Sequence, residues 1–307
     1  MAVADSSYSL PRRGWRALWF ALRLWFLRIA ASGCIPASWF GPPPPTAPAA
    51  RRGRLHIEIV SHCWNYSHML IYQLSALVLH PPREVEVTLT VFHAPEDTAT
   101  AALLAAFAQR RVTGVNWNFQ QLSRERLFRR SIGRNQAALA SRADWIWFTD
   151  CDLVCHAGCL DALGAALQGR RDVLVYPRQE RVTALLAADD ALLGTGEDGL
   201  PREIPTTRFE ERRIDRATGP LQITHGDVAR AMGYCAALPV YQEPMPQFAK
   251  CHEDRAFRWL LRSEGVPIDV PGVYRIRHQE KGRYQSAGGS AVRKRVRRLQ
   301  EWLRSLR

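Results

Sequence analysis

Two aspartates one residue apart, Asp150 and Asp152, directly follow the apolar run from Trp145 to Phe148. Because every position of this run is apolar, it predicts a central strand of a parallel sheet with helices on both faces. Open α/β sheets bind ligands just beyond the carboxyl ends of their strands, so both carboxylates are expected at a ligand-binding edge. Oxygen ligands there suit a hard divalent cation, which can neutralise a bound diphosphate. The alternative is that the aspartates only form a turn and cap a helix near residue 158.

Displacement of a diphosphate needs two further kinds of side chain. A metal held by Asp152, with help from His278, would neutralise the charge of the leaving group. A carboxylate and an imidazole suit Mn²⁺ better than the all-oxygen shell of Mg²⁺, and either divalent metal is expected as cofactor. The acceptor hydroxyl needs a base opposite the leaving group, and Asp254 is the candidate for an inverting reaction. Alternatively, Glu253 and Asp254 only favour a helix dipole, and His278 is a surface imidazole.

Strand and helix patterns alternate along the middle of the chain. The expected strands cover residues 55–60, 84–92, 112–117, 145–148, 172–176 and 273–278, and the expected helices cover residues 67–79, 96–108, 134–140, 160–167 and 252–262. This alternation predicts an α/β fold with a doubly wound, mostly parallel sheet. Residues 195–218 are polar and rich in turn formers, which predicts a long loop or lid.

Four short motifs, in their order and spacing, resemble family 2 glycosyltransferases of the GT-A fold over residues 55–285. They are Trp64-Asn65 after the first strand, Arg134-Asn135 before the strand that ends in Asp150 and Asp152, the pair Glu253-Asp254 at a helix start, and the late histidine His278. The family usually has an acidic pair after its second strand, whereas this chain has Phe92-His93 there and only Asp97 matches the later acid. The nucleotide base therefore stays open.

The resemblance implies a metal-dependent, inverting glycosyltransferase that moves a sugar from a nucleotide-sugar donor to a glycan or lipid-linked acceptor. By the same resemblance, Asp150 contacts the ribose or orients the metal shell, and Arg134, Asn135 and Asn65 belong to the donor site. Glu253 and Asp254 form the catalytic pair. One alternative is a nucleotidyltransferase that uses the same aspartates, although no Gly-rich basic loop stands near residues 55–62 to clamp a triphosphate. The other is a non-catalytic module that binds membranes or polyanions.

The net charge of +13 over 307 residues lies at the two ends of the chain. Residues 1–54 carry +7 and residues 287–307 carry +6, so the intervening residues sum to zero. A neutral body offers no basic footprint for nucleic acid, which excludes that class of partner. The predicted organisation is an amphipathic membrane-associating segment (1–40), a Pro-rich basic linker (41–54), the GT-A domain (55–286) and a basic amphipathic C-terminal helix (287–307).

The segment from Trp15 to Phe40 is aromatic and aliphatic but contains arginines at positions 16, 23 and 28. Arginines within the apolar stretch argue against a transmembrane helix and indicate an interfacial helix on an anionic leaflet, with the C-terminal helix as a second contact. A helix packed on the domain and a weak signal anchor are the alternatives, so whether the segment lies on or spans the membrane stays open. We expect a cytoplasmic protein, peripheral on the inner face of the membrane.

Seven cysteines are scattered along the chain, an odd number that does not indicate a disulfide framework and fits a reducing cytoplasm. Cys151, Cys155, His156 and Cys159 lie close together, but their spacing lacks the C-x2-C pair of zinc or iron–sulfur sites. We therefore expect small buried thiols.

Overall fold

The computed structural model describes residues 14–46, 48–194, 199–248 and 251–278. Its centre is a seven-stranded sheet in the order β10-β6-β9-β4-β1-β2-β3. These strands are β1 (His56–Cys63), β2 (Glu86–His93), β3 (Val115–Gln121), β4 (Trp145–Phe148), β6 (Leu174–Pro177), β9 (Gln222–His225) and β10 (Val266–Ile268). All neighbouring pairs are parallel except those of β9, which runs antiparallel to β4 and β6. The prediction of an α/β fold with a mostly parallel sheet is confirmed.

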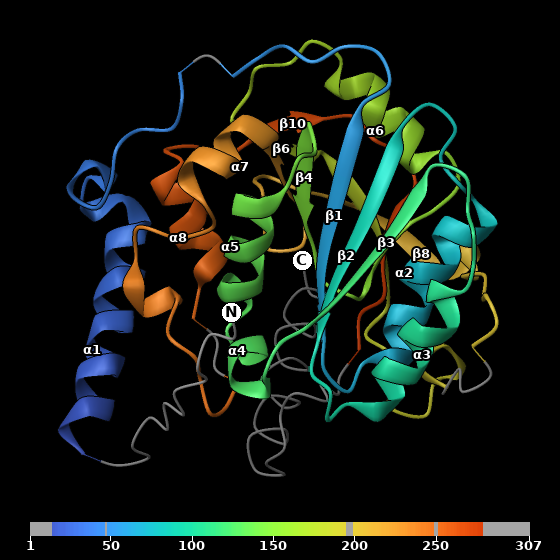
Figure 1. The fold of residues 1–307 in the computed structure, drawn as a ribbon, viewed down its shortest axis with the longest axis horizontal. Helices are drawn as coiled ribbons and strands as arrows, with labels where there is room; N and C mark the ends of the chain where they lie inside the picture. The colour runs from blue at the N-terminus through green and yellow to red at the C-terminus, as the bar shows by residue number, and fades with distance from the viewer. Residues whose placement is uncertain (1–13, 47, 195–198, 249–250, 279–307) are drawn as a thin grey trace, which may run out of the picture.

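Helices cover both faces of this sheet (Figure 1). The α-helices are α1 (Trp15–Ile29), α2 (Ser67–Leu79), α3 (Thr98–Ala108), α4 (Arg124–Phe128), α5 (Arg130–Ala140), α6 (Cys159–Leu167), α7 (Gly226–Met232) and α8 (Glu253–Leu260). The strand order advances from β1 to β3 and then returns to β4. Because parallel crossovers are right-handed, α2 and α3 lie on one face and α5 on the other, as Figure 1 shows.

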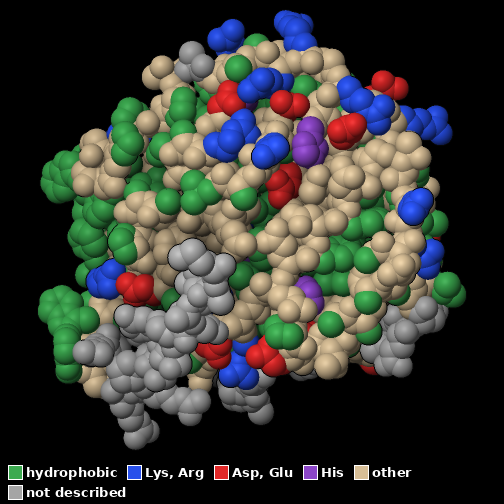
Figure 2. Space-filling model, viewed as in Figure 1, with side chains coloured by type: hydrophobic (Ala, Val, Ile, Leu, Met, Phe, Trp, Pro, Cys, Tyr) green, Lys and Arg blue, Asp and Glu red, His purple; other side chains and the backbone are tan. Residues whose placement is uncertain are grey.

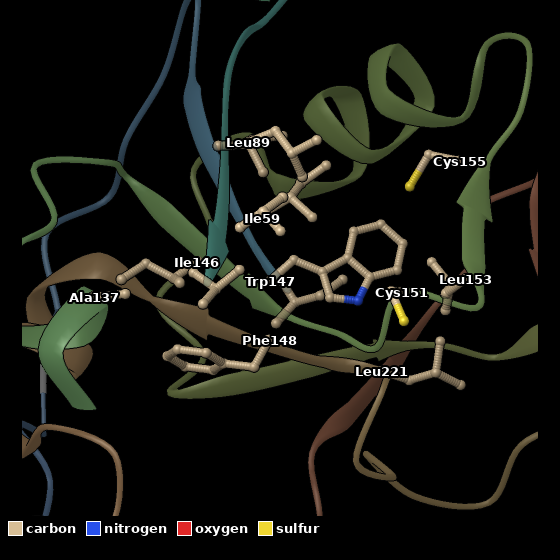
Figure 3. Packing of buried hydrophobic residues seen from close by; sticks show 14 of the residues in the cluster. Ile59, Leu89, Ala137, Ile146, Trp147, Phe148, Cys151, Leu153, Cys155 and Leu221 are labelled. Atoms are coloured by element: carbon tan, nitrogen blue, oxygen red, sulfur yellow. The ribbon is translucent and has the colours of Figure 1, made fainter. Parts of the chain in front are cut away.

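Strand β4 is the centre of the core, because all four of its side chains are fully buried. Figure 3 shows Trp147 directed toward Cys151 and Leu153, whereas Ile146 and Phe148 lie on the side of helix α5. The indole Nε1 of Trp147 donates to the carbonyl of Pro220 (2.9 Å), which satisfies its one polar group. Burial on both faces explains why the sequence of this strand does not alternate.

A second sheet of four short strands packs beside the first in the order β5-β11-β7-β8. The strands are β5 (Leu153–Cys155), β7 (Gln179–Thr183), β8 (Phe209–Arg213) and β11 (Val273–Arg275). The sequence-based expectation of a continuous loop over residues 195–218 is wrong where β8 forms. The buried carboxylate of Glu180 on β7 makes ion pairs with Arg212 on β8 and with Arg275 on β11, the latter at 2.6 Å. The two arginines neutralise the buried charge of a strand that has no apolar pattern.

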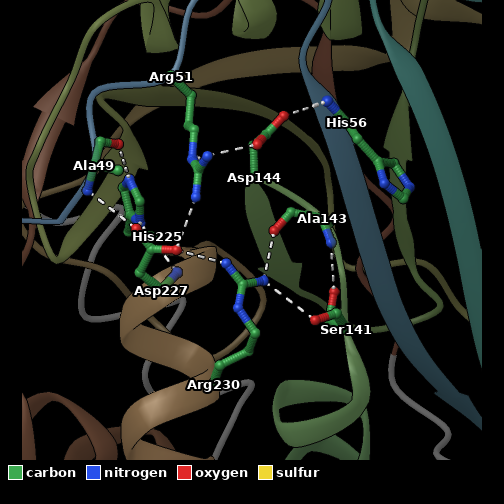
Figure 4. A network of polar contacts seen from close by, with 9 residues as sticks. All are labelled: Ala49, Arg51, His56, Ser141, Ala143, Asp144, His225, Asp227 and Arg230. Atoms are coloured by element: carbon green, nitrogen blue, oxygen red, sulfur yellow. Dashed lines mark hydrogen bonds and ion pairs between the residues drawn. The ribbon is translucent and has the colours of Figure 1, made fainter.

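Residues 49–54, the last part of the predicted Pro-rich basic linker, make hydrogen bonds to the domain. The carboxylate of Asp227 accepts from the amide of Ala49 (3.0 Å) and from the guanidinium of Arg51 (3.1 Å), as Figure 4 shows. Arg51 also lies 3.6 Å from Asp144, at the start of β4. Burial alone would raise the pKa of Asp227, but these donors and Arg230 lower it to about 2. The end of the Pro-rich segment is thus fixed on α7 and β4.

Helix α1 packs on the domain with one side. Arg23 pairs with Glu243 (3.2 Å), the Arg129 guanidinium lies 5.4 Å from the centre of the Phe20 ring, and Leu27 is buried. Just beyond the helix, the carbonyl of Ile35 accepts from the indole of Trp259 on α8 (2.8 Å). Helix α1 therefore contacts α8 and the turn at Pro239–Tyr241.

The other side of α1 is apolar and faces outward. Seven large apolar side chains of α1 are exposed to solvent: Trp15, Leu18, Trp19, Leu22, Trp25, Phe26 and Ile29. Together with Trp39 from the turn that follows, their exposed fractions range from 38% to 75%. Figure 2 shows hydrophobic side chains gathered along the edge of the molecule that α1 occupies. No helix among the described residues is long and apolar enough to cross a membrane. The expected C-terminal helix (287–307) lies outside the described residues.

Candidate donor site

A cavity opens at the carboxyl ends of β1 and β4, where the sequence predicts a ligand site. It encloses about 510 Å³ including its open mouth. Its lining comes from the ends of these strands, from α4 and α5, and from Phe248, and comprises His62, Cys63, Trp64, Tyr66, Leu127, Phe128, Arg130, Asp150, Cys151, Asp152 and Phe248. The mixture of aromatic walls with a few charged groups is typical of a small-molecule site.

Two arginines of helix α5 hold the carboxylate of Asp150. Arg130 makes a short ion pair with Asp150 Oδ1, and Arg134 Nη2 lies 3.3 Å from the same oxygen. Arg134 is almost fully buried and also donates to the Thr149 carbonyl (3.0 Å) and the Tyr234 hydroxyl (2.8 Å). Burial alone would lower the pKa of Arg130, but the neighbouring Asp150 raises it, so Arg130 carries a permanent positive charge on the cavity wall.

His62 contributes a neutral imidazole to the cavity. Burial, followed by the charges of Arg134 and Arg130, lowers its pKa well below 6.5. Its ring stacks on Phe92 at 5.1 Å between centroids, and a Cβ at Gly133 would collide with it. The absence of a side chain at Gly133 therefore allows α5 to approach β1 closely.

The second sheet brings His278 to the edge of the cavity that contains the aspartate pair. Strand β11 pairs antiparallel with β5, with Arg275 opposite Leu153, and the Ile276 amide donates to the Asp152 carbonyl (3.0 Å). Beyond β11, His278 forms an isolated parallel bridge with Leu186. Its buried ring packs edge-on against Tyr66 at 5.2 Å between centroids, and Tyr66 lines the cavity. Carboxylates and an imidazole brought to one place are a suitable donor set for Mn²⁺.

Glu253 and Asp254 begin helix α8 but point to different partners, and neither lines the cavity. Glu253 is buried and lies 3.7 Å from the fully buried guanidinium of Arg129. Its charge helps to raise the pKa of Arg130, which indicates that it lies on the side of the Asp150 cluster. Asp254 is 37% exposed and lies 3.6 Å from Arg258, one turn along the helix.

The other residues expected in the donor site lie around the cavity rather than in its wall. Asn65 is exposed and adopts a left-handed backbone (φ 54°), and its amide donates to Asp97 (2.6 Å). Asn135 does not open its helix, because α5 already begins at Arg130; its side chain accepts from the Tyr234 amide (2.9 Å). Asp97 caps α3 through Thr100 (3.1 Å), so its carboxylate is already used within the protein.

Sequence reasoning missed Arg129, Arg130 and His62. The two arginines follow a run of polar and basic residues that gives no periodic signal. Had the helix been extended N-terminally to Arg130, this residue would have stood one turn before Arg134, on the same face. His62 ends the expected first strand, a position at which a ligand contact is common.

Residues 96–212 match the family model described as "Glycosyl transferase family 2". Over these residues the chain is similar to family 2 glycosyltransferases. The matched region contains helix α5, strand β4 and the aspartate pair, which carried part of the resemblance in the sequence. The match favours a glycosyltransferase over the nucleotidyltransferase and the non-catalytic module considered from the sequence. No curated protein matches the chain.

Solved glycosyltransferase structures are similar to this enzyme at low sequence identity. The mannosyltransferase PcManGT from Pyrobaculum calidifontis, in complex with GDP-Man and Mn²⁺, is 15% identical with a TM-score of 0.44; the alignment covers 94% of this chain and 76% of that one. TarS 1-349 from S. aureus in complex with UDP is 14% identical with a TM-score of 0.45, and 72% of this chain aligns with 60% of TarS. The chain thus spans about three fifths of that TarS structure.

Proposed function

We propose that this glycosyltransferase moves a sugar from a nucleotide-sugar donor to a glycan or lipid-linked acceptor, with a divalent metal and with inversion. The observation that carries the proposal is the cavity at the ends of β1 and β4, where Asp150, Asp152 and Arg130 meet beside the strand that leads to His278. Positive and negative groups side by side suit a ligand that combines a diphosphate with a metal ion.

In this proposal, Asp152 and His278 would hold the metal, which would supply positive charge to neutralise the departing diphosphate. Arg130 faces the same cavity with a permanent positive charge and binds a diphosphate oxygen. Arg134 is almost fully buried, so it acts through its contact with Asp150 and keeps that carboxylate in one orientation. Trp64 and Phe128 pack edge to face (5.4 Å) and give the cavity an apolar wall.

The base that activates the acceptor comes from the start of α8. Asp254 is the candidate because its half-exposed carboxylate can be reached by an acceptor, whereas Glu253 is buried against Arg129. A base on the side of the sugar opposite the diphosphate leads to inversion of the anomeric centre. The ion pair between Glu253 and Arg129 then fixes the start of the helix that carries Asp254.

We also propose that the enzyme lies on the inner face of an anionic membrane through α1. The supporting observation is the continuous outward apolar face of α1, including Trp15, Trp19 and Trp25, on a helix whose other side is attached to the domain. Tryptophan side chains favour the bilayer interface, and the arginines near the N-terminus favour anionic lipids. A lipid-linked acceptor would then meet the enzyme at the same surface.

The test of the catalytic proposal is donor binding in the presence of metal. Nucleotide sugars are screened by thermal shift with and without Mn²⁺, because a ligand at a hundred times its Kd stabilises a protein by about 2.7 kcal/mol. We expect stabilisation that needs the metal and that Asp152→Asn weakens together with Mn²⁺ binding. Full donor binding in the presence of chelator, or an unchanged Mn²⁺ titration of Asp152→Asn, would contradict the assignment.

A further inference from the structure

A second cluster of metal-ligand side chains lies away from the donor site. The Nε2 atom of His80 is 2.7 Å from Glu203 Oε2, and that of His156 is 3.0 Å from Glu203 Oε1. The two imidazole rings are 4.5 Å apart between centroids. One ligand atom from each residue lies within 4.8 Å of the other two. Within the described part of the chain, these three side chains are close enough together to hold one metal ion.

Three separate segments bring these side chains together, each held by a backbone contact. His80 follows the last residue of α2, and its amide donates to Ala76 (2.9 Å). His156 follows β5, and its amide donates to Gly272 (2.8 Å). Beside Glu203, the amide of Arg202 donates to Ser75 on α2 (2.8 Å). The three positions are therefore set by the fold rather than by the side chains alone.

The cluster is separate from the candidate donor site. Helix α2 starts at Ser67, next to the cavity-lining Tyr66, and His80 follows its far end. At 1.5 Å per residue, the thirteen residues of α2 place His80 about 20 Å from Tyr66, whereas His156 follows Asp152 by four residues and lies within about 14 Å of it. A ligand bound at the cluster would thus act on the fold and not on the reacting atoms.

The geometry and charge of the cluster suit a borderline divalent ion. In a tetrahedral zinc site, two ligand atoms that each lie 2.0–2.1 Å from the ion are about 3.3 Å apart, so a pair at the 4.8 Å limit of this cluster closes by about 1.5 Å when the ion binds. The carboxylate of Glu203 also accepts a hydrogen bond from the Ile204 amide (3.0 Å), which helps to fix its orientation. Glu203 is 50% exposed, so an ion can enter and water can complete the shell.

The nearby thiols do not compete for the ion. Cys155 and Cys159 flank His156 in the sequence but are buried. The ring of His156 packs instead against Tyr274 at 5.3 Å between centroids, which holds it toward Glu203.

We propose that His80, His156 and Glu203 form a second metal site, which binds Zn²⁺ or a chemically similar transition-metal ion with water as a fourth ligand. Two imidazoles and one carboxylate are a recognised donor set for zinc, whereas Mg²⁺ prefers an all-oxygen shell. The bound ion clips the segment that leads from β7 to β8 onto the end of α2 and onto β5. Its role is structural and does not depend on the proposed transferase reaction.

The test is metal binding by the tag-free full chain, with Mg²⁺ in excess to occupy oxygen-rich sites. Co²⁺ is added as a spectroscopic substitute and followed by its visible absorption, and Zn²⁺ is then used to displace it. All proteins carry Cys34→Ser, because Cys34 is the exposed thiol among the cysteines. Glu203→Gln and His80→Gln remove one ligand each, and their amides can keep a hydrogen bond within the cluster. His56→Gln, at a histidine on β1 that bonds Thr88, is the matched control.

We expect the parent protein and His56→Gln to bind one equivalent of Co²⁺, displaced by Zn²⁺, more than the ligand variants bind. Each ligand variant should bind more weakly by more than the roughly 10- to 100-fold that loss of an outer-shell partner costs. Zn²⁺ should also slow proteolysis within residues 199–208 in the parent but not in Glu203→Gln. Absence of stoichiometric binding in the parent, or equal binding in the parent and both ligand variants, would overturn the proposal. Circular dichroism of each metal-free variant confirms that it is folded, so a loss of binding is assigned to the missing ligand.

Discussion

The buried pair Arg129–Glu253 allows a sharp test of how the start of α8 is held. The guanidinium Nη1 lies 3.7 Å from Glu253 Oε1, with side-chain exposures of 0% and 10%. Arg129→Met therefore leaves a carboxylate with little access to water. Removing one partner of such a pair costs about 3–5 kcal/mol, a large share of the roughly 5–15 kcal/mol that stabilise a typical domain.

The reciprocal change, Glu253→Gln, should be less costly. The amide oxygen of glutamine still accepts a hydrogen bond, and the Arg129 guanidinium keeps its position over the rings of Phe20 (5.4 Å) and Tyr241 (5.7 Å). A loss of about 1–3 kcal/mol is expected, the usual range for a compromised buried hydrogen bond. In the double variant no charge remains without its partner, so its loss should be smaller than the sum of the single losses by about 0.5–3 kcal/mol.

The assay is urea unfolding of the two single variants and the double variant, followed by tryptophan fluorescence, beside turnover per folded molecule. If Glu253 only positions α8, the double variant should recover stability and keep measurable turnover. Losses that add to within about 0.5 kcal/mol would refute the coupling of the pair. Complete loss of turnover in a stable Glu253→Gln protein would instead give Glu253 the catalytic role that we assign to Asp254.

Three further predictions address the base, the linker and the membrane face. Asp254→Asn should lower turnover by roughly 10²- to 10⁴-fold with little change in donor Kd, and a change below tenfold in turnover per folded enzyme would remove it from the mechanism. Because the pKa of Asp227 is lowered from 3.8 to about 2, its charged form adds stability above about pH 4 that is lost as the pH falls toward 2. Asp227→Asn should thus cost about 2 kcal/mol at pH 7 and almost nothing at pH 2, which urea midpoints at both pH values would check. Trp19→Glu combined with Trp25→Glu should weaken binding to anionic vesicles without lowering the thermal stability, and unchanged cosedimentation would exclude α1 as the anchor.

Local sequence patterns determined most of the central sheet. Burial alone predicts the uninterrupted apolar run of β4, the alternation in β2 and the helix Ser67–Leu79. The spacing of apolar residues within each segment reflects which of its faces are buried. The two aspartates could be placed at the ligand-binding edge for the same reason, since they end a strand that is buried on both faces.

Local sequence patterns did not predict the polar strands. Strands β7 and β8 have no apolar stripe and form around the ion pairs of Glu180 with Arg212 and Arg275, which come from three different places in the chain. Strand β9 was also missed, and its antiparallel insertion between β4 and β6 is a long-range choice of partner. Such pairings depend on contacts between distant residues that a local window does not contain.

The tertiary structure also decided the two sites and the orientation of α1. Only the pairing of β11 with β5 brings His278 against Tyr66 at the edge of the cavity, and only the ends of α2 and β5 bring His80 and His156 to Glu203. For α1, the sequence shows an aromatic helix with arginines but not which side is attached. The contacts of Arg23 and Leu27 with the domain direct the tryptophans outward, because a helix can bury only one side against a single neighbour.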